Sequence, residues 1–149
     1  MNEITYGIAP YKSDDYDMIL KMRDEVMRQP IGLTLSEQDV ADDSTAEHVW
    51  LRVNGEIKAT AKLVAEDENT IRLRMVAVSQ QSQGMGLGRL IVEFCENYVA
   101  ARGHSRIIFD ARLNVEGFYS KLGYEVSGDV YEKVGIPHVF MSKDISQAI

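Results

Sequence analysis

The chain of 149 residues has a single cysteine, three prolines and no long hydrophobic run. Because Cys95 has no second cysteine to pair with, an internal disulfide framework and a CxxC zinc site are excluded. The histidines, His48, His104 and His138, lie far apart and form no HExxH motif, so we expect no metal site. No apolar stretch approaches the roughly 18 to 20 residues of a membrane span, and the first residues lack a signal-peptide pattern. We therefore expect a cytoplasmic protein with no membrane partner.

The formal net charge is −7, and this acidic balance also excludes a class of partner. Binding to nucleic acid usually needs a basic face, so we expect no nucleic acid partner, whereas a small cationic partner is mildly favoured. The hydrophobic fraction of 45% and the charged fraction of 26% are typical of one compact domain with a sizeable core. We expect a single domain over residues 1–149, and a homodimer is left open.

Hydrophobic periodicity divides the chain into strands and helices. The Asn54-Gly55 pair between two strand-like runs predicts a tight antiparallel hairpin, since a type I′ turn needs positive φ at both central residues. The expected order is βαβββαβαββ, an α/β fold in which helices flank a mixed, mostly antiparallel twisted sheet. The expected strands cover residues 3–9, 48–53, 56–65, 70–78, 106–111, 124–126 and 138–143, and the expected helices cover 14–30, 87–102 and 115–122.

The first helix is predicted from its cap, because Ser13 precedes three aspartates that suit the positive end of a helix dipole. Its expected apolar stripe, up to Pro30, is Met18, Ile19, Met22 and Val26. Residues 31–45 follow without a clear period and carry four acidic side chains. We interpret them as a solvated loop with an additional short helix near residue 37. The alternative is that they form part of a mouth that attracts an amine.

The stretch SQQSQGMGLGRLIVEF, residues 79–94, places three glycines at alternate positions directly before an amphipathic helix. A helix N-terminus offers unpaired N–H groups, and glycines allow an anion to approach the backbone, so the stretch predicts a phosphate cradle. A flexible strand-to-helix turn is the alternative. The nucleotide triphosphatase pattern GxxxxGK[ST] does not fit. The dinucleotide pattern GxGxxG matches Gly84, Gly86 and a later acid, Asp110, but has Arg89 where its third glycine should lie.

The spacing Gln83-x-x-Gly86-x-Gly88 resembles the acyl-CoA pyrophosphate motif of the GNAT superfamily of N-acetyltransferases. The segment ARLNVEGFYSKLGYEV, residues 111–126, is similar to the late part of that family. VGIPHVFMSK, residues 134–143, resembles the last strand of its bacterial ElaA-like branch, which carries GIPH there. The resemblance covers most of the chain and implies a single N-acetyltransferase domain of the GNAT-type fold.

The resemblance also implies which residues hold acetyl-CoA. Backbone groups of Val76 and Val78 would pair with the pantetheine arm, and the N–H near Val76 would stabilise the developing oxyanion. The family's usual asparagine position falls on Arg112, while Asn114 lies two residues later, and either side chain is a candidate for a pantetheine contact. The residues expected around the diphosphate are Gln83, Gly84, Met85, Gly86, Leu87, Gly88 and Arg89.

The reaction implied is direct attack of a primary amine on the acetyl thioester in a ternary complex, without a metal. Tyr119 is the family-matched proton donor to the leaving thiolate, and a purely structural aromatic beside Phe118 is the alternative. The strand over residues 70–78 carries no carboxylate that could serve as a base. We favour His138 as the base, while His48, Glu132 and a chain of water molecules stay open.

Three alternatives accompany this hypothesis. Cys95 could carry the acetyl group in a ping-pong route, but its place on the apolar stripe of a helix is typical of a packed thiol. The protein could also be a non-catalytic acyl-CoA sensor, or a dinucleotide-binding oxidoreductase built on Gly84, Gly86 and Asp110. A small-molecule amine is the first expectation for the acceptor, and a protein N-terminus or lysine is the second.

Overall fold

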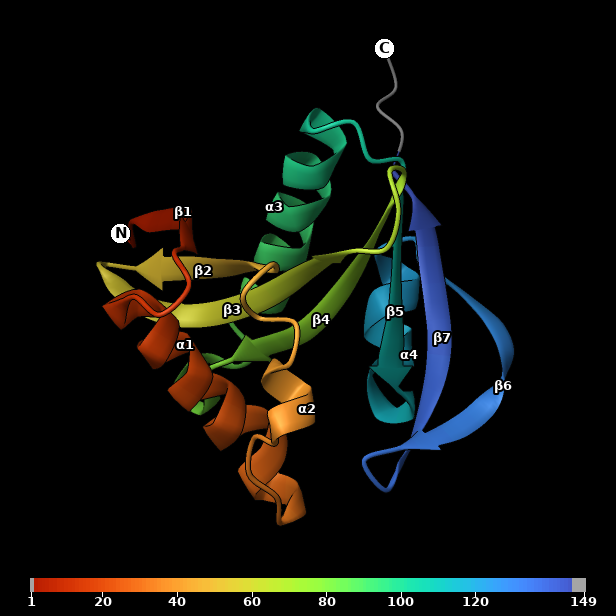
Figure 1. Ribbon diagram of the computed structural model, residues 1–149, viewed down its shortest axis with the longest axis horizontal. Helices are drawn as coiled ribbons and strands as arrows, with labels where there is room; N and C mark the ends of the chain where they lie inside the picture. The colour runs from red at the N-terminus through yellow and green to blue at the C-terminus, as the bar shows by residue number, and fades with distance from the viewer. Residues whose placement is uncertain (1, 146–149) are drawn as a thin grey trace.

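Seven strands form one mixed sheet in the order β1-β2-β3-β4-β5-β7-β6 (Figure 1). The computed structural model describes residues 2–145. All neighbouring strands pair antiparallel except β4 and β5, which are parallel, so the predicted fold class and element order are confirmed. The strands are β1 (Ile4–Ala9), β2 (Glu47–Val53), β3 (Glu56–Ala65), β4 (Thr70–Val78), β5 (Arg106–Arg112), β6 (Glu125–Lys133) and β7 (Ile136–Asp144). The α-helices are α1 (Asp14–Arg23), α2 (Glu37–Val40), α3 (Leu87–Ala101) and α4 (Glu116–Lys121).

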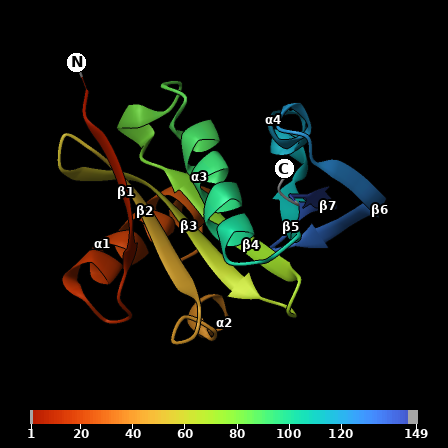
Figure 2. The same ribbon diagram turned by 90° about the horizontal axis from the view of Figure 1, so that it is seen from above.

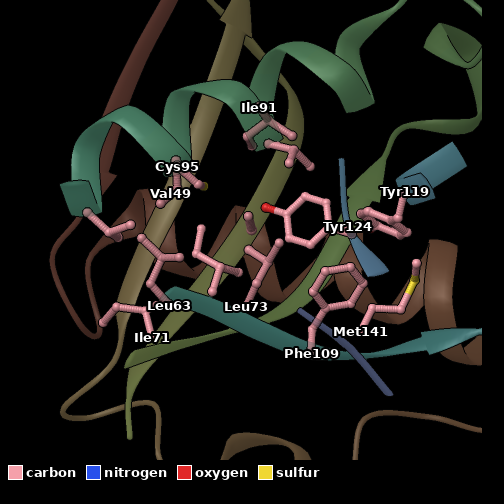
Figure 3. Close-up of a cluster of buried hydrophobic side chains, with 14 of the residues drawn as sticks. Val49, Leu63, Ile71, Leu73, Ile91, Cys95, Phe109, Tyr119, Tyr124 and Met141 are labelled. Atoms are coloured by element: carbon pink, nitrogen blue, oxygen red, sulfur yellow. The ribbon is translucent and has the colours of Figure 1, made fainter. Parts of the chain in front are cut away.

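The two faces of the sheet are covered by different helices (Figure 2). Along β2, Val49 belongs to the main core with α3, whereas the next residue, Trp50, packs with Ile19 of α1 on the opposite face. The main core joins α3 to the strands and to aromatic side chains near α4 (Figure 3). Its labelled members are Val49, Leu63, Ile71, Leu73, Ile91, Cys95, Phe109, Tyr119, Tyr124 and Met141.

The first helix begins where predicted but buries a different face. The Ser13 hydroxyl accepts a hydrogen bond from the Tyr16 N–H at 3.2 Å. Helix α1 ends at Arg23 and continues as a π-helical turn, Asp24–Arg28, followed by a 3₁₀ turn, Gln29–Ile31. Its buried residues are Tyr16, Ile19 and Arg23, while Met18 is 54% exposed, so the predicted stripe is wrong at Met18.

Both tight hairpins contain a positive-φ pair, although only one was predicted. Asn54 and Gly55 have φ of 51° and 89°, which confirms the first hairpin. Val134 and Gly135, with φ of 49° and 77°, make the turn between β6 and β7. Strand β6 therefore extends to Lys133, far beyond the predicted residues 124–126. It is an edge strand with nearly every side chain exposed, so its sequence carries no alternating hydrophobic signal.

The sheet opens between its two parallel strands. Strands β4 and β5 pair only through Thr70–Arg72 with Arg106–Ile108, and beyond these residues they diverge (Figure 1). A register shift between β3 and β4 leaves Met75 and Val76 opposite Ala61, and Met75 has a φ of 52°, as in a β-bulge. The bulge lies in the half of β4 that has left β5.

Three of the four acidic side chains in residues 31–45 form ion pairs with basic side chains, so the interpretation as a solvated loop is wrong at Asp39, Asp42 and Asp43. Most other residues of the stretch are exposed, and the short helix near residue 37 is confirmed as α2. The Lys62 ammonium, with no exposed surface, forms ion pairs with Asp42 and Asp43. Arg28 binds Asp39 through two hydrogen bonds of 3.0 and 2.9 Å. These pairs fix α2 and the turns after α1 against the sheet.

Candidate functional site

A cavity of about 710 Å³ occupies the opening between β4 and β5. Its walls come from the diverging strands, the loop before α3, helix α4, the π-helical turn and the β6–β7 turn. Of the twelve residues that the sequence predicts for the site, all except Met85 line it, and the Met85 side chain is 53% exposed. The lining residues among them are Val76, Val78, Gln83, Gly84, Gly86, Leu87, Gly88, Arg89, Arg112, Tyr119 and His138.

The loop before α3 presents free backbone donors to this cavity. Gly84 and Gly86 have φ of 85° and 81°, and a β-carbon at either position would meet no atom within 4 Å. Gly86 is the N-cap of α3 and supplies no side-chain cap. Within residues 2–145, no atom accepts a hydrogen bond from the backbone N–H groups of residues 84–89. The first N–H of the helix that donates a hydrogen bond is that of Leu90, to Gly86 O at 3.2 Å. Unpaired amides at a helix N-terminus suit an anion such as a diphosphate.

Three other residues of the motif, Gln83, Gly88 and Arg89, contact neighbouring parts of the protein. A β-carbon on Gly88 would lie 3.3 Å from the Phe118 Cζ atom, so this glycine allows α3 to approach α4. The Gln83 side-chain amide donates to Val78 O at 3.2 Å and ties the loop to the end of β4. Arg89 forms an ion pair of 3.2 Å with Glu93 one turn along α3.

The free edge of β4 supplies a second set of backbone groups. Past Arg72, this edge pairs with no strand in the described part of the chain. Val76 and Val78 lie on the unpaired stretch and line the cavity. An extended chain could therefore add to β4 as a further strand would.

Tyr119 lies on α4 at the wall of the cavity, 7% exposed, with its ring centroid 4.4 Å from that of Phe109. Within residues 2–145 its hydroxyl makes no hydrogen bond, unlike that of Tyr124, which donates to Glu96 at 2.8 Å. Burial, with a smaller effect of Cys95, raises the pKa of Tyr119. The phenol therefore stays protonated at neutral pH and has a proton to donate.

His138 lines the same cavity and is 5% exposed. Its Nδ1 lies 2.9 Å from Ile136 O. Because a carbonyl oxygen only accepts, Nδ1 carries the hydrogen and Nε2 holds the lone pair of the neutral ring. This tautomer leaves Nε2 able to take a proton.

The other two candidates for the base lie outside the cavity. The Arg23 guanidinium donates to His48 Nδ1 at 3.1 Å, so His48 Nε2 carries the hydrogen and donates to Asp43 O at 2.8 Å. Burial, together with the charge of Arg23, lowers the pKa of His48 despite the Asp43 carbonyl. Glu132 is exposed on the edge strand β6. Cys95 does not line the cavity either, has no exposed surface, and its thiol pKa is raised by burial.

Asp110 stands at the centre of a cluster that the sequence did not reveal. Its carboxylate accepts from Arg72 at 2.9 Å, from Lys133 at 3.0 Å and from the Tyr131 hydroxyl. Both oxygens are engaged, so Asp110 is poorly suited to bind the ribose of a dinucleotide. Arg112, two residues along β5, donates to Met27 O at 2.6 Å, and exposed Asn114 lies nearby in the cavity wall.

In the part of the chain that the structure describes, no group of three or more His, Cys, Asp or Glu side chains is placed to hold a metal ion. Over the same residues, no helix is long and apolar enough to cross a bilayer.

Comparison with known proteins identifies the family. Residues 24–145 match the model of the acetyltransferase (GNAT) domain. The chain is 33% identical over 81 residues to YyaT of Bacillus subtilis (strain 168), a match that covers 54% of this chain and 55% of YyaT. It therefore spans about half the length of that curated relative. It is 27% identical over 120 residues to ElaA of Escherichia coli (strain K12), covering 74% of this chain and 76% of ElaA.

Solved structures share the fold at low sequence identity. A structure from Lactobacillus plantarum superposes with a TM-score of 0.83 at 22% identity, covering 97% of this chain and 98% of the other. The E. coli ElaA structure gives a TM-score of 0.79 at 21% identity, covering 96% and 99%. A GNAT family acetyltransferase from Elizabethkingia anophelis with acetyl-CoA bound gives 0.73 at 16% identity, covering 95% and 97%. The chain belongs to the GNAT acetyltransferase family, whose chemistry is acyl transfer, and is related to its ElaA branch.

Proposed function

We propose that the protein transfers the acetyl group of acetyl-CoA to a primary amine by direct attack in a ternary complex. The observation that carries this proposal is the row of unpaired amides of residues 84–89, which opens on a cavity that continues between β4 and β5. A diphosphate would satisfy those amides, and the free edge of β4 would receive the amide groups of a pantetheine arm.

The residues present fit acetyl-CoA, because the two positive-φ glycines leave open space where a β-carbon would otherwise stand. The acetyl-CoA bound to the E. anophelis relative supports the same cofactor here. When bound, acetyl-CoA supplies an activated acetyl group. The chain contributes the N–H groups of residues 84–89 for the phosphates, and backbone groups of Val76 and Val78 for the arm and the developing oxyanion.

Two side chains are assigned to the proton transfers. Nε2 of His138 accepts the proton that the amine must lose before or during attack. The Tyr119 hydroxyl donates a proton to the leaving thiolate, which its unpartnered position in the cavity wall supports. Direct transfer is favoured over a ping-pong route because Cys95 has no exposed surface and does not line the cavity.

The proposal is tested by incubating the protein with acetyl-CoA and a panel of primary amines while free thiol is titrated. Amine-dependent thiol release, with kinetics that require both substrates before either product leaves, is the expected result. Tight binding of acetyl-CoA with no thiol release from any amine would instead support an acyl-CoA sensor. A rise in thermal stability with NADH but not with CoA would contradict both the acetyltransferase and the sensor, and would favour an oxidoreductase.

A further inference from the structure

The cavity is basic although the chain as a whole carries a net charge of −7. Five basic side chains line it, against a single acid, Asp110. Four of the five have an acidic partner in the described residues. These pairs are Arg28–Asp39 at 2.9 Å, Arg74–Asp42 at 3.3 Å, Arg89–Glu93 at 3.2 Å and Lys133–Asp110 at 3.0 Å. Arg112 is the exception.

Arg112 is a half-buried cation that forms no ion pair within residues 2–145. One of its five N–H donors goes to Met27 O at 2.6 Å, and the other four have no acceptor there. Burial first, and the charge of nearby Arg28 second, lower the pKa of Arg112. Since a partly desolvated charge is costly without a counter-ion, this guanidinium would gain from an anion in the cavity.

The position of Arg112 on β5 determines the face of the sheet on which such an anion would lie. Its neighbour on β5, Ala111, belongs to the core with α3 and α4, so Arg112 points to the opposite face, where it meets Met27. Across the β5–β7 pair, Arg112 stands directly opposite His138. Side chains at such paired positions share a face, with β-carbons about 4.5 to 5.5 Å apart. An anion on Arg112 would therefore lie close to the imidazole assigned to receive the amine's proton.

We propose that Arg112 binds a carboxylate of the acceptor, and that the acceptor is a small molecule bearing both a primary amine and a carboxylate, as an amino acid does. This inference rests on the proposed function. The planar guanidinium fork suits a planar carboxylate, which it can bind through two parallel hydrogen bonds. The carboxylate would anchor the molecule while its amine is presented to His138. Arg112 then belongs to the acceptor side, and Asn114 is left as the candidate for the pantetheine arm.

The test compares matched acceptors in the thiol-release assay. Each amino acid is paired with the amine that lacks its carboxylate and with its amide, for example phenylalanine, phenethylamine and phenylalaninamide. In the series with the best acceptor, we expect kcat/KM to be higher for the amino acid by roughly 30-fold or more. This factor is the low end of the loss expected when one partner of a buried, hydrogen-bonded charge pair is removed. Arg112→Met should abolish the preference, and Arg112→Lys should keep part of it. Arg106→Met, at the exposed far end of β5, is the matched control and should leave the preference intact.

Equal or better use of the carboxylate-free amines would overturn the inference and leave the acetyltransferase proposal standing. A carboxylate preference that persists in Arg112→Met would also overturn it. If no amine releases thiol, the amino acids are titrated by calorimetry into the protein saturated with CoA. Binding that Arg112→Met removes and Arg106→Met retains would then support the carboxylate site while contradicting turnover. Absence of binding would contradict the carboxylate site too.

Discussion

Gly88 of α3 lies so close to Phe118 of α4 that an added β-carbon would stand 3.3 Å from the ring's Cζ atom. Gly84 and Gly86 differ from it, because both have positive φ and open space around the missing side chain. The three glycines therefore have two physical roles. Two of them shape a loop whose amides stay free, and the third allows two helices to pack closely.

Replacing Gly84 by alanine should weaken cofactor binding beyond its cost in stability. A φ of 85° strains an alanine, so the free energy of unfolding should fall by about 1 kcal/mol. Gly55→Ala is the matched control, because Gly55 has a φ of 89°, has open space around it and lies outside the cavity. Both variants should lose similar stability in urea, while only Gly84→Ala should lose affinity for CoA, by about tenfold in calorimetry. If both variants bind CoA with the same affinity, Gly84 does not contribute to phosphate binding.

Tyr119→Phe should lose rate without losing stability. Its hydroxyl makes no hydrogen bond in the described structure, so unfolding should change by less than about 0.5 kcal/mol. Loss of a general acid typically lowers kcat by about 10² or more. Tyr124→Phe is the opposite case, since that hydroxyl is bonded to Glu96 and does not line the cavity. It should be destabilised by about 1 kcal/mol with kcat almost unchanged. If both variants keep wild-type kcat, Tyr119 is only a core aromatic.

The features that the sequence predicted well are those that local residues determine. The bounds of β4 match the prediction because alternate side chains face a core, and the Asn54-Gly55 turn needs only its own two residues. The glycine loop could be predicted for the same reason, because its glycines and the amphipathic helix that follows them are adjacent in the chain. Local signals were therefore enough to indicate the loop that lines the cavity before α3.

The features that the sequence did not predict depend on distant partners. Lys62 sits in a strand of small and apolar residues, and only the fold shows that it is fully buried on Asp42 and Asp43. Arg112 meets Met27, 85 positions away in the chain. Thr60 and Lys62 alternate with core residues of β3 and are buried on the opposite face of the sheet. Their alternation is the sequence pattern that could have indicated a polar buried face.

Cys95→Ala should retain acetyl transfer. The thiol has no exposed surface and lies outside the cavity, so its loss leaves a small void that costs about 1 kcal/mol in unfolding. The native protein should also resist alkylation by iodoacetamide, because burial keeps the thiol protonated. Steady-state thiol release by Cys95→Ala at more than about half the wild-type kcat is expected. Loss of all turnover in a folded variant would restore the ping-pong route.

The pair between Arg28 and Asp39 should make stability depend on pH below 4. Burial tends to raise the pKa of Asp39, but hydrogen bonds from Arg28 and Ser36 outweigh it and lower the value to about 2. An unfolded aspartate titrates near 3.9. The contribution is therefore complete above about pH 4 and is lost as the pH falls towards 2, and we expect about 1 to 2 kcal/mol.

Urea unfolding of wild type and Asp39→Asn measures this contribution. The difference between their free energies of unfolding should be largest at pH 5 to 7 and should shrink between pH 4 and 2. Glu37→Gln, on the exposed face of the same short helix, is the control and should follow wild type throughout. A difference that is constant with pH would show that ionised Asp39 adds no stability.

His138→Gln should change the pH dependence of turnover as well as its size. Without an Nε2 lone pair in the cavity, the variant should depend on amine that is already neutral in solution. That fraction rises about tenfold per pH unit as long as the pH stays below the pKa of the amine. We expect kcat/KM at pH 7 to fall by about 10² or more and then to recover steeply between pH 7 and 9, relative to wild type. His104→Gln, outside the cavity, should keep the wild-type profile. A His138→Gln profile parallel to that of wild type would mean that the amine loses its proton to some other group.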